Sequence, residues 1–192
     1  MTPPILWLDF DDVIGNLLAA WVGRYNELSG DTLTEDDIVS WDTGTYCTRI
    51  SRNKLYRILD EPDLYDRVEP MPNVQSGIAA LDAMGVRWRI ATFTCSAAMA
   101  VGKVNWLKRH NLGREYKGQW PGNLVCISDK SVLRGWGILD DGAHNLESFD
   151  GFRYLFDRPH NKEANVPHAV RVYGWRDFVC LLENTQPWRS DA

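Results

Sequence analysis

Short apolar runs alternate with amphipathic stretches along the chain, and this alternation predicts the secondary structure. Residues 4–10 form an apolar run that ends in acidic residues, as expected for a fully buried strand. Further short strands are predicted at 86–92, 124–127, 136–139, 152–156 and 170–173. Apolar residues at helical spacing predict helices at 16–29, 54–59, 74–84, 101–110 and 175–182.

The order of these elements predicts the fold. Strands that alternate with helices imply right-handed crossovers and a mainly parallel sheet, with helices on both faces. The stretch 17–72 lies between the first two strands and is too long and irregular for a simple crossover. We therefore predict a three-layer α/β core, formed by residues 1–16 and 73–192, with a small helical cap formed by residues 17–72.

Composition narrows the class of protein. The 192 residues, 44% of them hydrophobic and 24% charged, suit one globular domain with its own core. A net charge of −5 disfavours a nucleic acid polymer as partner, because binding to one requires a basic surface. The apolar run at residues 5–8 is too short for a secretion signal or a membrane span.

The four cysteines point to a reducing compartment. Cys47, Cys95, Cys126 and Cys180 lie far apart and form no CxxC pair, which disfavours a zinc ribbon or a secreted disulfide framework. We expect reduced and mostly buried thiols in a cytoplasmic protein.

Carboxylate pairs follow two of the predicted strands. Asp9 and Asp11 come after the first strand, and Asp140 and Asp141 come after the strand at 136–139. Ligands bind at the carboxyl ends of the strands in such a sheet, so these four groups converge there if the two strands are neighbours. Carboxylates so close together cannot all stay ionised without a cation. A hard divalent ion with oxygen ligands, Mg²⁺ above all, is therefore expected where phosphate also binds.

Two other strand ends offer groups for binding a phosphate. Thr92 ends the second strand and provides a hydroxyl, with Thr94 on the same face as the alternative. Lys130 follows the third strand and provides a cation. Together with a nucleophilic carboxylate, an acid/base carboxylate and a metal site, these are the groups that phosphoryl transfer needs.

The ordered set resembles a known family. Asp9-x-Asp11-x-Val13, Thr92, Lys130 and Asp140-Asp141 look like the four motifs of the haloacid dehalogenase-like phosphatases. More narrowly, the chain is similar to the 5'(3')-deoxyribonucleotidases, with supporting segments at 68–72, 103–107, 127–130, 138–146, 155–157 and 171–175. The resemblance covers nearly the whole chain and implies a Rossmann-like core.

The resemblance also implies roles for individual residues. Asp9 would take the phosphoryl group as an aspartyl-phosphate, and Asp11 would protonate the leaving oxygen and then activate water. The Asp9 carboxylate, the Asp11 carbonyl and the acidic pair, through Asp141, would hold Mg²⁺. Thr92 and Lys130 would bind the phosphate.

Two positions depart from the family pattern. Asp12 stands where the family usually has Gly, which adds a charge next to the nucleophile. Phe93 follows the motif threonine where a small residue is usual, so either Thr92 or Thr94 can be that threonine.

Four other residues have both a structural and a functional interpretation. Asn16 can contact substrate or cap the helix that follows it. Trp41 can stack on a nucleobase or belong to the core of the cap. His144 and His160 have no partner at metal-ligand spacing, so we interpret both as structural or surface residues.

The favoured function is Mg²⁺-dependent hydrolysis of a small phosphomonoester, and the resemblance implies a (deoxy)nucleoside monophosphate. One alternative is a phosphatase of the same superfamily that acts on a sugar phosphate or another small ester. Another is a catalytically silent binding protein, against which the intact motif carboxylates and Lys130 argue. The preferred base and sugar stay open, and so does the oligomeric state, with a homodimer as one option.

Overall fold

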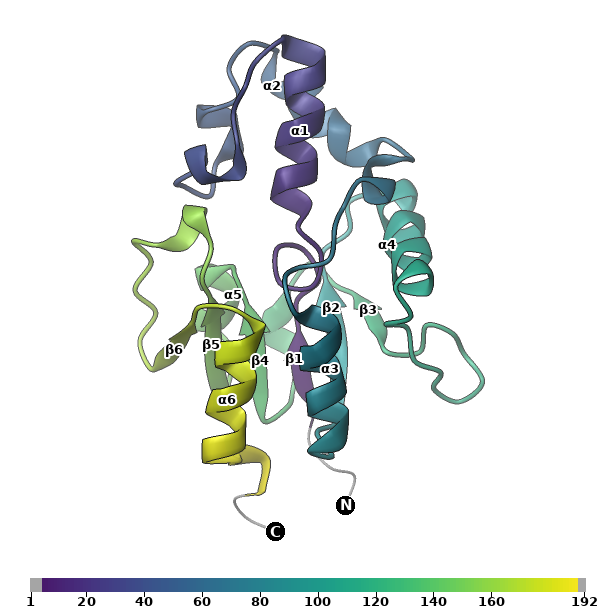
Figure 1. Ribbon diagram of the computed structural model, residues 1–192, viewed down its shortest axis with the longest axis vertical. Coiled ribbons are helices and arrows are strands. Elements are labelled where there is room, and N and C mark those ends of the chain that lie inside the picture. The colour runs from purple at the N-terminus through teal and green to yellow at the C-terminus, as the bar shows by residue number, and fades with distance from the viewer. Residues whose placement is uncertain (1–4, 190–192) are drawn as a thin grey trace.

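The structure is a computed structural model, which describes residues 5–189, and its strands form one parallel sheet (Figure 1). The strands are β1 (Leu6–Leu8), β2 (Trp88–Thr92), β3 (Leu124–Cys126), β4 (Gly137–Asp140), β5 (Phe152–Phe156) and β6 (Ala169–Val172). Their order is β3-β2-β1-β4-β5-β6, and every neighbouring pair is parallel. All six predicted strands are therefore present, and the predicted α/β class is confirmed.

The helices also lie close to their predicted positions. They are α1 (Leu17–Ser29), α2 (Arg52–Arg57), α3 (Val74–Ala83), α4 (Ala97–Arg109), α5 (Ala143–Glu147) and α6 (Trp175–Thr185). Helix α4 begins four residues before its predicted start, because the Ser96 side chain accepts a hydrogen bond from the Met99 amide and caps its first turn. The short α5 was not predicted, since five residues are too few to show a helical period.

Strand residues alternate between two apolar layers, as expected for a sheet that is covered on both faces. Leu6 and Leu8 face the larger layer, which contains the buried side chains of α3, α4 and α6. Trp7 faces the smaller layer, together with Leu146 of α5. Helices α3 and α6 pack closely at Gly77, where a Cβ atom would lie only 2.3 Å from the Trp175 ring. The three predicted layers are thus present, with more helix on one face than on the other.

The inserted segment 17–72 lies over the carboxyl ends of the strands (Figure 1). It has apolar residues of its own, and the Trp21 indole of α1 donates a 3.0 Å hydrogen bond to the Leu55 carbonyl of α2. It also approaches the core closely, since a Cβ atom on Gly102 of α4 would lie 2.6 Å from the Tyr65 ring. The division into a core and a cap at residues 16 and 73 stays a prediction, and residues 1–4 and 190–192 of that core lie outside the described residues.

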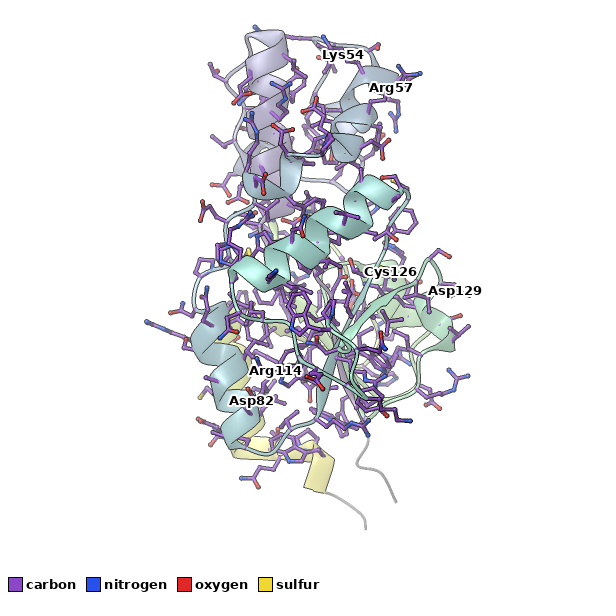
Figure 2. The ribbon with its side chains drawn as sticks, turned by 90° about the vertical axis from the view of Figure 1, so that its right-hand side faces the viewer. Lys54, Arg57, Asp82, Arg114, Cys126 and Asp129 are labelled. Carbon is purple, nitrogen blue, oxygen red and sulfur yellow. The ribbon has the colours of Figure 1, made fainter. Side chains whose placement is uncertain are left out.

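The prediction that the cysteines are mostly buried is wrong. All four thiols are free, but only Cys47 is buried. Cys126 ends β3, which is an edge strand with no neighbour on its outer side, and it lies at the surface (Figure 2). Cys180 occupies an exposed position on α6. None of the helices within residues 5–189 is long and apolar enough to cross a membrane.

Candidate active site

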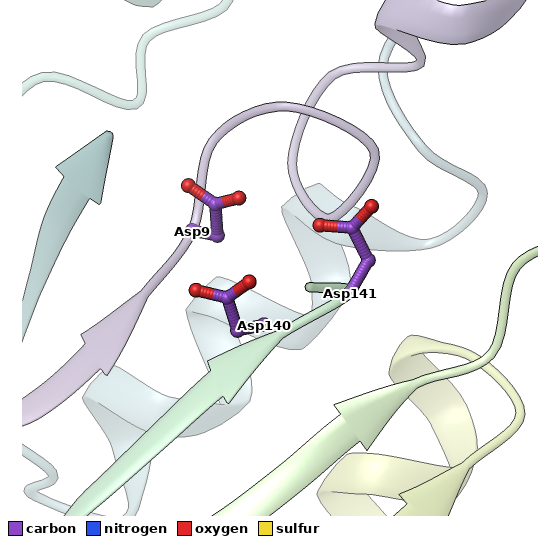
Figure 3. A group of neighbouring side chains, drawn as sticks. All are labelled: Asp9, Asp140 and Asp141. Carbon is purple, nitrogen blue, oxygen red and sulfur yellow. The ribbon is translucent and has the colours of Figure 1, made fainter. Parts of the chain in front are cut away.

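Three carboxylates meet where β1 and β4 end (Figure 3). These strands are neighbours, with Leu8 opposite Leu139, so Asp9 and the pair Asp140–Asp141 emerge side by side. One oxygen from each carboxylate lies within 4.8 Å of the others, and all three residues are buried. An all-oxygen donor set of this kind fits a hard divalent cation. The convergence predicted from the two apolar runs is therefore present.

Burial and mutual repulsion disfavour the charged forms of these carboxylates. Burial raises the pKa of Asp9 well above its ordinary value, and Asp140 and Asp141 raise it further. Burial, together with the charge of Asp140, raises the pKa of Asp141 to about 8. Both pKa shifts arise from burial and from protein charges, so a cation bound here would lower the pKa of both carboxyl groups. If all the carboxylates of the cluster are ionised, the positive groups of the protein around them do not balance their negative charge.

Lys130 is the cation that the chain places in this cluster. Its ammonium group lies 2.7 Å from Asp9 Oδ1 and 2.7 Å from Asp140 Oδ2. Burial lowers the pKa of Lys130, but the two carboxylates outweigh burial and raise it above its ordinary value. The residue begins the turn Lys130–Val132, which follows β3, and its side chain is almost entirely buried. A single lysine on a surface loop would not be held in this way.

The two members of the acidic pair have different surroundings. Asp140 accepts hydrogen bonds from Lys130, from the Gly142 amide at 2.8 Å and from the Asn145 side chain at 3.0 Å. Asp141 Oδ2 lies 2.8 Å from Nε2 of His160. Asp140 is thus occupied by protein donors on both oxygens, whereas Asp141 has a protein partner on only one oxygen.

Asp11 follows Asp9 by two residues and is held by a lysine that sequence reasoning missed. Lys103 Nζ donates to Asp11 Oδ2, to the Thr92 hydroxyl and to the Phe93 carbonyl, each at 2.6 Å. The Tyr65 hydroxyl donates to Asp11 Oδ1 at 3.3 Å. Lys103 is wholly buried in α4.

The sequence did contain a signal for Lys103. It lies four residues after Met99 and three residues before Trp106, which places it on the apolar face of its helix. Lysine is almost never fully buried without a partner, so this placement implies a buried carboxylate or carbonyl nearby.

The two candidate threonines differ in their contacts. Thr92 is fully buried at the end of β2 and is joined to Asp11 through Lys103. Thr94 lies two residues beyond the strand and is only half-buried. Neither side chain is among those that line the cavity, so the structure favours Thr92 only through its link to Lys103.

A cavity of about 630 Å³ separates these charged groups from the inserted segment. Its charged floor includes Asp9, Asp11, Lys130 and Asp141. The opposite side combines apolar and aromatic residues with a few polar ones, and its main members are Leu18, Trp21, Ser40, Trp41, Asp42, Thr43, Arg52, Tyr56, Leu59, Phe93 and Met99. A cavity of this size and lining suits a small ligand with one anionic end and one flatter, less polar end.

Trp41 and the two histidines meet at the mouth of this cavity. Trp41 is 57% exposed, so it is part of the wall and not of the cap interior. Its ring lies edge-on to His144 at 4.7 Å and to His160 at 5.3 Å between centroids. Neither histidine was predicted as a site residue. Both line the cavity, and the contacts that bring them there join residues far apart in the sequence.

The first turn after β1 explains the roles of Asp12 and Asn16. Asp12 has a φ of 58°, a left-handed conformation that glycine adopts most easily. Its carboxylate accepts a 3.1 Å hydrogen bond from the Leu18 amide at the start of α1. Asn16 directly precedes α1 but makes no capping bond and does not line the cavity. Asp12 therefore caps the helix in place of Asn16.

Comparison with known proteins identifies the family. Residues 3–186 match the family described as "5' nucleotidase, deoxy (Pyrimidine), cytosolic type C protein". The chain belongs to this family. A 5'(3')-deoxyribonucleotidase of Bacillus subtilis (strain 168) is 32% identical over 175 residues, which cover 91% of this chain and 95% of the relative. One from Clostridium acetobutylicum is 29% identical over 187 residues, 96% and 97% of the two chains. This nucleotidase family member is a phosphomonoester hydrolase.

Solved structures agree on the fold. A HAD family hydrolase from Deinococcus radiodurans R1 superposes with a TM-score of 0.57 at 12% identity, over 100% of both chains. A hydrolase from Pseudomonas syringae gives 0.54 at 13% identity, over 94% of this chain and 98% of that one. The Rossmann-like, haloacid dehalogenase-like fold that the motifs implied is therefore confirmed for this nucleotidase.

Proposed function

We propose that this nucleotidase is a Mg²⁺-dependent 5'(3')-deoxyribonucleotidase that acts through an aspartyl-phosphate on Asp9. The main observation is the cluster of Asp9, Asp140, Asp141 and Lys130 on the floor of a cavity large enough for a nucleoside monophosphate. The deoxyribonucleotidases among its relatives support the choice of substrate.

The residues present fit a divalent cation. Within residues 5–189, one oxygen of Asp9 and one of Asp141 accept no hydrogen bond from the protein, whereas both Asp140 oxygens do. We therefore assign the cation to the Asp9 carboxylate, the Asp11 carbonyl and Asp141, with Asp140 holding Lys130 in place. When bound, Mg²⁺ would neutralise charge on these carboxylates and on the phosphoryl oxygens.

Asp9 is proposed as the nucleophile. One of its oxygens would attack phosphorus and form the acyl-phosphate bond as the phosphorus–oxygen bond to the nucleoside breaks, while the other would face the cation. Lys130 pairs with the carboxylate through Oδ1. Lys130 lines the cavity next to Asp9 and can contact a phosphoryl oxygen. Its positive charge would offset the repulsion between the carboxylates and the anionic phosphate during attack. Thr92, or Thr94 as the alternative, would donate its hydroxyl to a second phosphoryl oxygen.

Asp11 is proposed as the acid and base. In its acid form it gives a proton to the leaving oxygen, which produces the nucleoside. Its carboxylate then takes a proton from the water that attacks the phosphorus, which releases phosphate and restores Asp9. Lys103 and Tyr65 hold the Asp11 carboxyl from two sides, so its orientation is fixed before substrate binds.

The rest of the cavity would hold the nucleoside. Trp41, Tyr56 and Phe93 provide aromatic surface, and Leu18 and Met99 provide aliphatic surface. Aromatic faces bind nucleobases by stacking, at about 1–3 kcal/mol per base. The leaving group is therefore selected by the segment 17–72 and the loop after β2, while the strand ends contact only the phosphate.

A phosphate-release screen tests this proposal. Deoxynucleoside 5'- and 3'-monophosphates, ribonucleotides, sugar phosphates and p-nitrophenyl phosphate would be compared with and without Mg²⁺. We expect the highest kcat/KM on a deoxynucleoside monophosphate, and we expect no phosphate release from any substrate without a divalent ion. A preference for a sugar phosphate over every nucleotide would overturn the substrate assignment, and full turnover without divalent ions would overturn the metal assignment.

A further inference from the structure

A polar network around the buried guanidinium of Arg158 joins three distant parts of the chain. Arg158 Nη2 donates to Asp12 Oδ1 at 3.3 Å and to Asn16 Oδ1 at 2.8 Å, and it also pairs with Glu35 Oε2. Asn16 Nδ2 donates to the other Glu35 oxygen at 3.2 Å. Arg158 is only 7% exposed, so its attraction to these groups is weakly screened by water.

Glu35 belongs to a turn that has no buried apolar side chain of its own, although the next residue, Ile38, is fully buried in the core. This turn, η1 (Glu35–Asp37), has no buried residue. It lies against η6 (Pro159–Asn161), the turn that directly follows Arg158. The bonds from Glu35 to Arg158 and Asn16 are the polar contacts that join η1 to the core, beside the apolar anchor of Ile38.

The cavity wall begins a few residues after this turn. Residues 40–43 line the cavity, and Trp41 among them packs edge-on against His160 of η6. The wall is thus linked to the core through Glu35 and through Trp41, which packs against His160 of η6 and against His144 of α5. A shift of η1 away from Arg158 would move the wall away from the charged floor.

We propose that Glu35 and Arg158 are positioning residues that hold the wall 40–43 against the core and so determine how tightly the leaving group is bound. Neither side chain lines the cavity, so they act through the wall and not on the substrate. The inference rests on the proposed function, because it assumes a leaving group large enough to reach the wall. A nucleoside satisfies this condition better than the single ring of p-nitrophenyl phosphate.

Glu35→Ala tests the proposal in kinetics, with Asp36→Ala as the matched control. Asp36 is exposed on the same turn and, in the part of the chain that the structure describes, its side chain makes no ion pair. Glu35→Ala should raise KM for a deoxynucleoside monophosphate about tenfold and change kcat/KM for p-nitrophenyl phosphate less than about twofold. Asp36→Ala should match the wild type on both substrates. Equal losses on both substrates in Glu35→Ala, or no loss on either, would overturn the proposal.

Amide hydrogen exchange tests the same proposal without any substrate. Exchange in residues 38–46 should be about tenfold faster in Glu35→Ala and intermediate in Glu35→Gln, which keeps an oxygen acceptor but loses the charge. Unchanged exchange in Glu35→Ala would overturn the positioning role. A wild-type enzyme that hydrolyses p-nitrophenyl phosphate but no nucleotide would instead overturn the proposed function, so the two failures are distinguishable.

Discussion

The ammonium group of Lys103 lies 2.6 Å from Asp11 Oδ2, in a fully buried position on α4. The same group holds the Thr92 hydroxyl, so it joins the ends of β1 and β2 beside the nucleophile. We predict that Lys103→Met lowers kcat about 100-fold on nucleotides and on p-nitrophenyl phosphate alike. A misplaced Asp11 no longer activates the water that hydrolyses the acyl-phosphate, a step common to both substrates, and such catalysis contributes roughly 10²–10⁴.

The exposed Lys108 of the same helix provides the control for this prediction. Lys108→Met should leave kcat unchanged, and thermal unfolding of both variants should show that each is folded. A kcat for Lys103→Met within threefold of the wild type would show that Asp11 needs no such partner.

Divalent metal should affect stability as well as activity. Three buried carboxylates lie together and Lys130 pairs with only two of them, so a cation that binds only the folded state removes an electrostatic cost. At about 100 times its dissociation constant, Mg²⁺ should stabilise the fold by roughly 2.7 kcal/mol. Thermal unfolding with EDTA and with added Mg²⁺ measures this effect. Asp141→Asn should remove most of the difference, and an equal shift in that variant would place the cation elsewhere.

Trp41 offers a test of the leaving-group site. Trp41→Ala should lower kcat/KM for a deoxynucleoside monophosphate about tenfold to a hundredfold, as expected if a stacked base contributes roughly 1–3 kcal/mol. The effect on p-nitrophenyl phosphate should be small, because that ester has no base. Trp41→Phe, which keeps an aromatic face, is the control and should recover most of the loss. Equal losses on both esters would mean that Trp41 only supports the histidines beside it.

Asp12→Gly tests why this chain has an aspartate at a left-handed position. Glycine would relieve about 1 kcal/mol of backbone strain. It would also remove the cap of α1, which is worth about 1 kcal/mol, and one hydrogen bond to Arg158, worth about 1.5–3 kcal/mol. We therefore predict a net loss of about 1.5–3 kcal/mol in the free energy of unfolding. Urea denaturation measures it, with Asp12→Asn expected to lose less, and a more stable glycine variant would contradict the prediction.

The sheet and its charged end could be predicted from the sequence because short apolar runs and the residues after them are local signals. Asp9, Asp140 and Asp141 lie at the ends of two buried strands, so a parallel sheet brings them together once these strands are neighbours. Lys130 was predicted at the same end of the sheet because it follows the third predicted strand. The predictions that concern these residues' chemical roles stay predictions.

The parts that could not be predicted depend on contacts between distant segments. His160 reaches Asp141 across 19 residues, and Arg158 reaches Glu35 across 123, so no local pattern reveals either pair. The exposure of Cys126 depends on which strand lies at the edge of the sheet, and the order of strands is not written in any one of them.

The most direct test of the central claim is the capture of phosphate on Asp9. The Asp11→Asn variant, incubated with radiolabelled p-nitrophenyl phosphate and Mg²⁺, should form the acyl-phosphate because p-nitrophenolate leaves without a proton. It should then hydrolyse that bond slowly, because no base activates water. Acid quenching and peptide mapping should find close to one label per chain on the peptide that contains Asp9, and none in Asp9→Asn. Continued turnover by Asp11→Asn with no label on that peptide would contradict the account and favour direct attack by water.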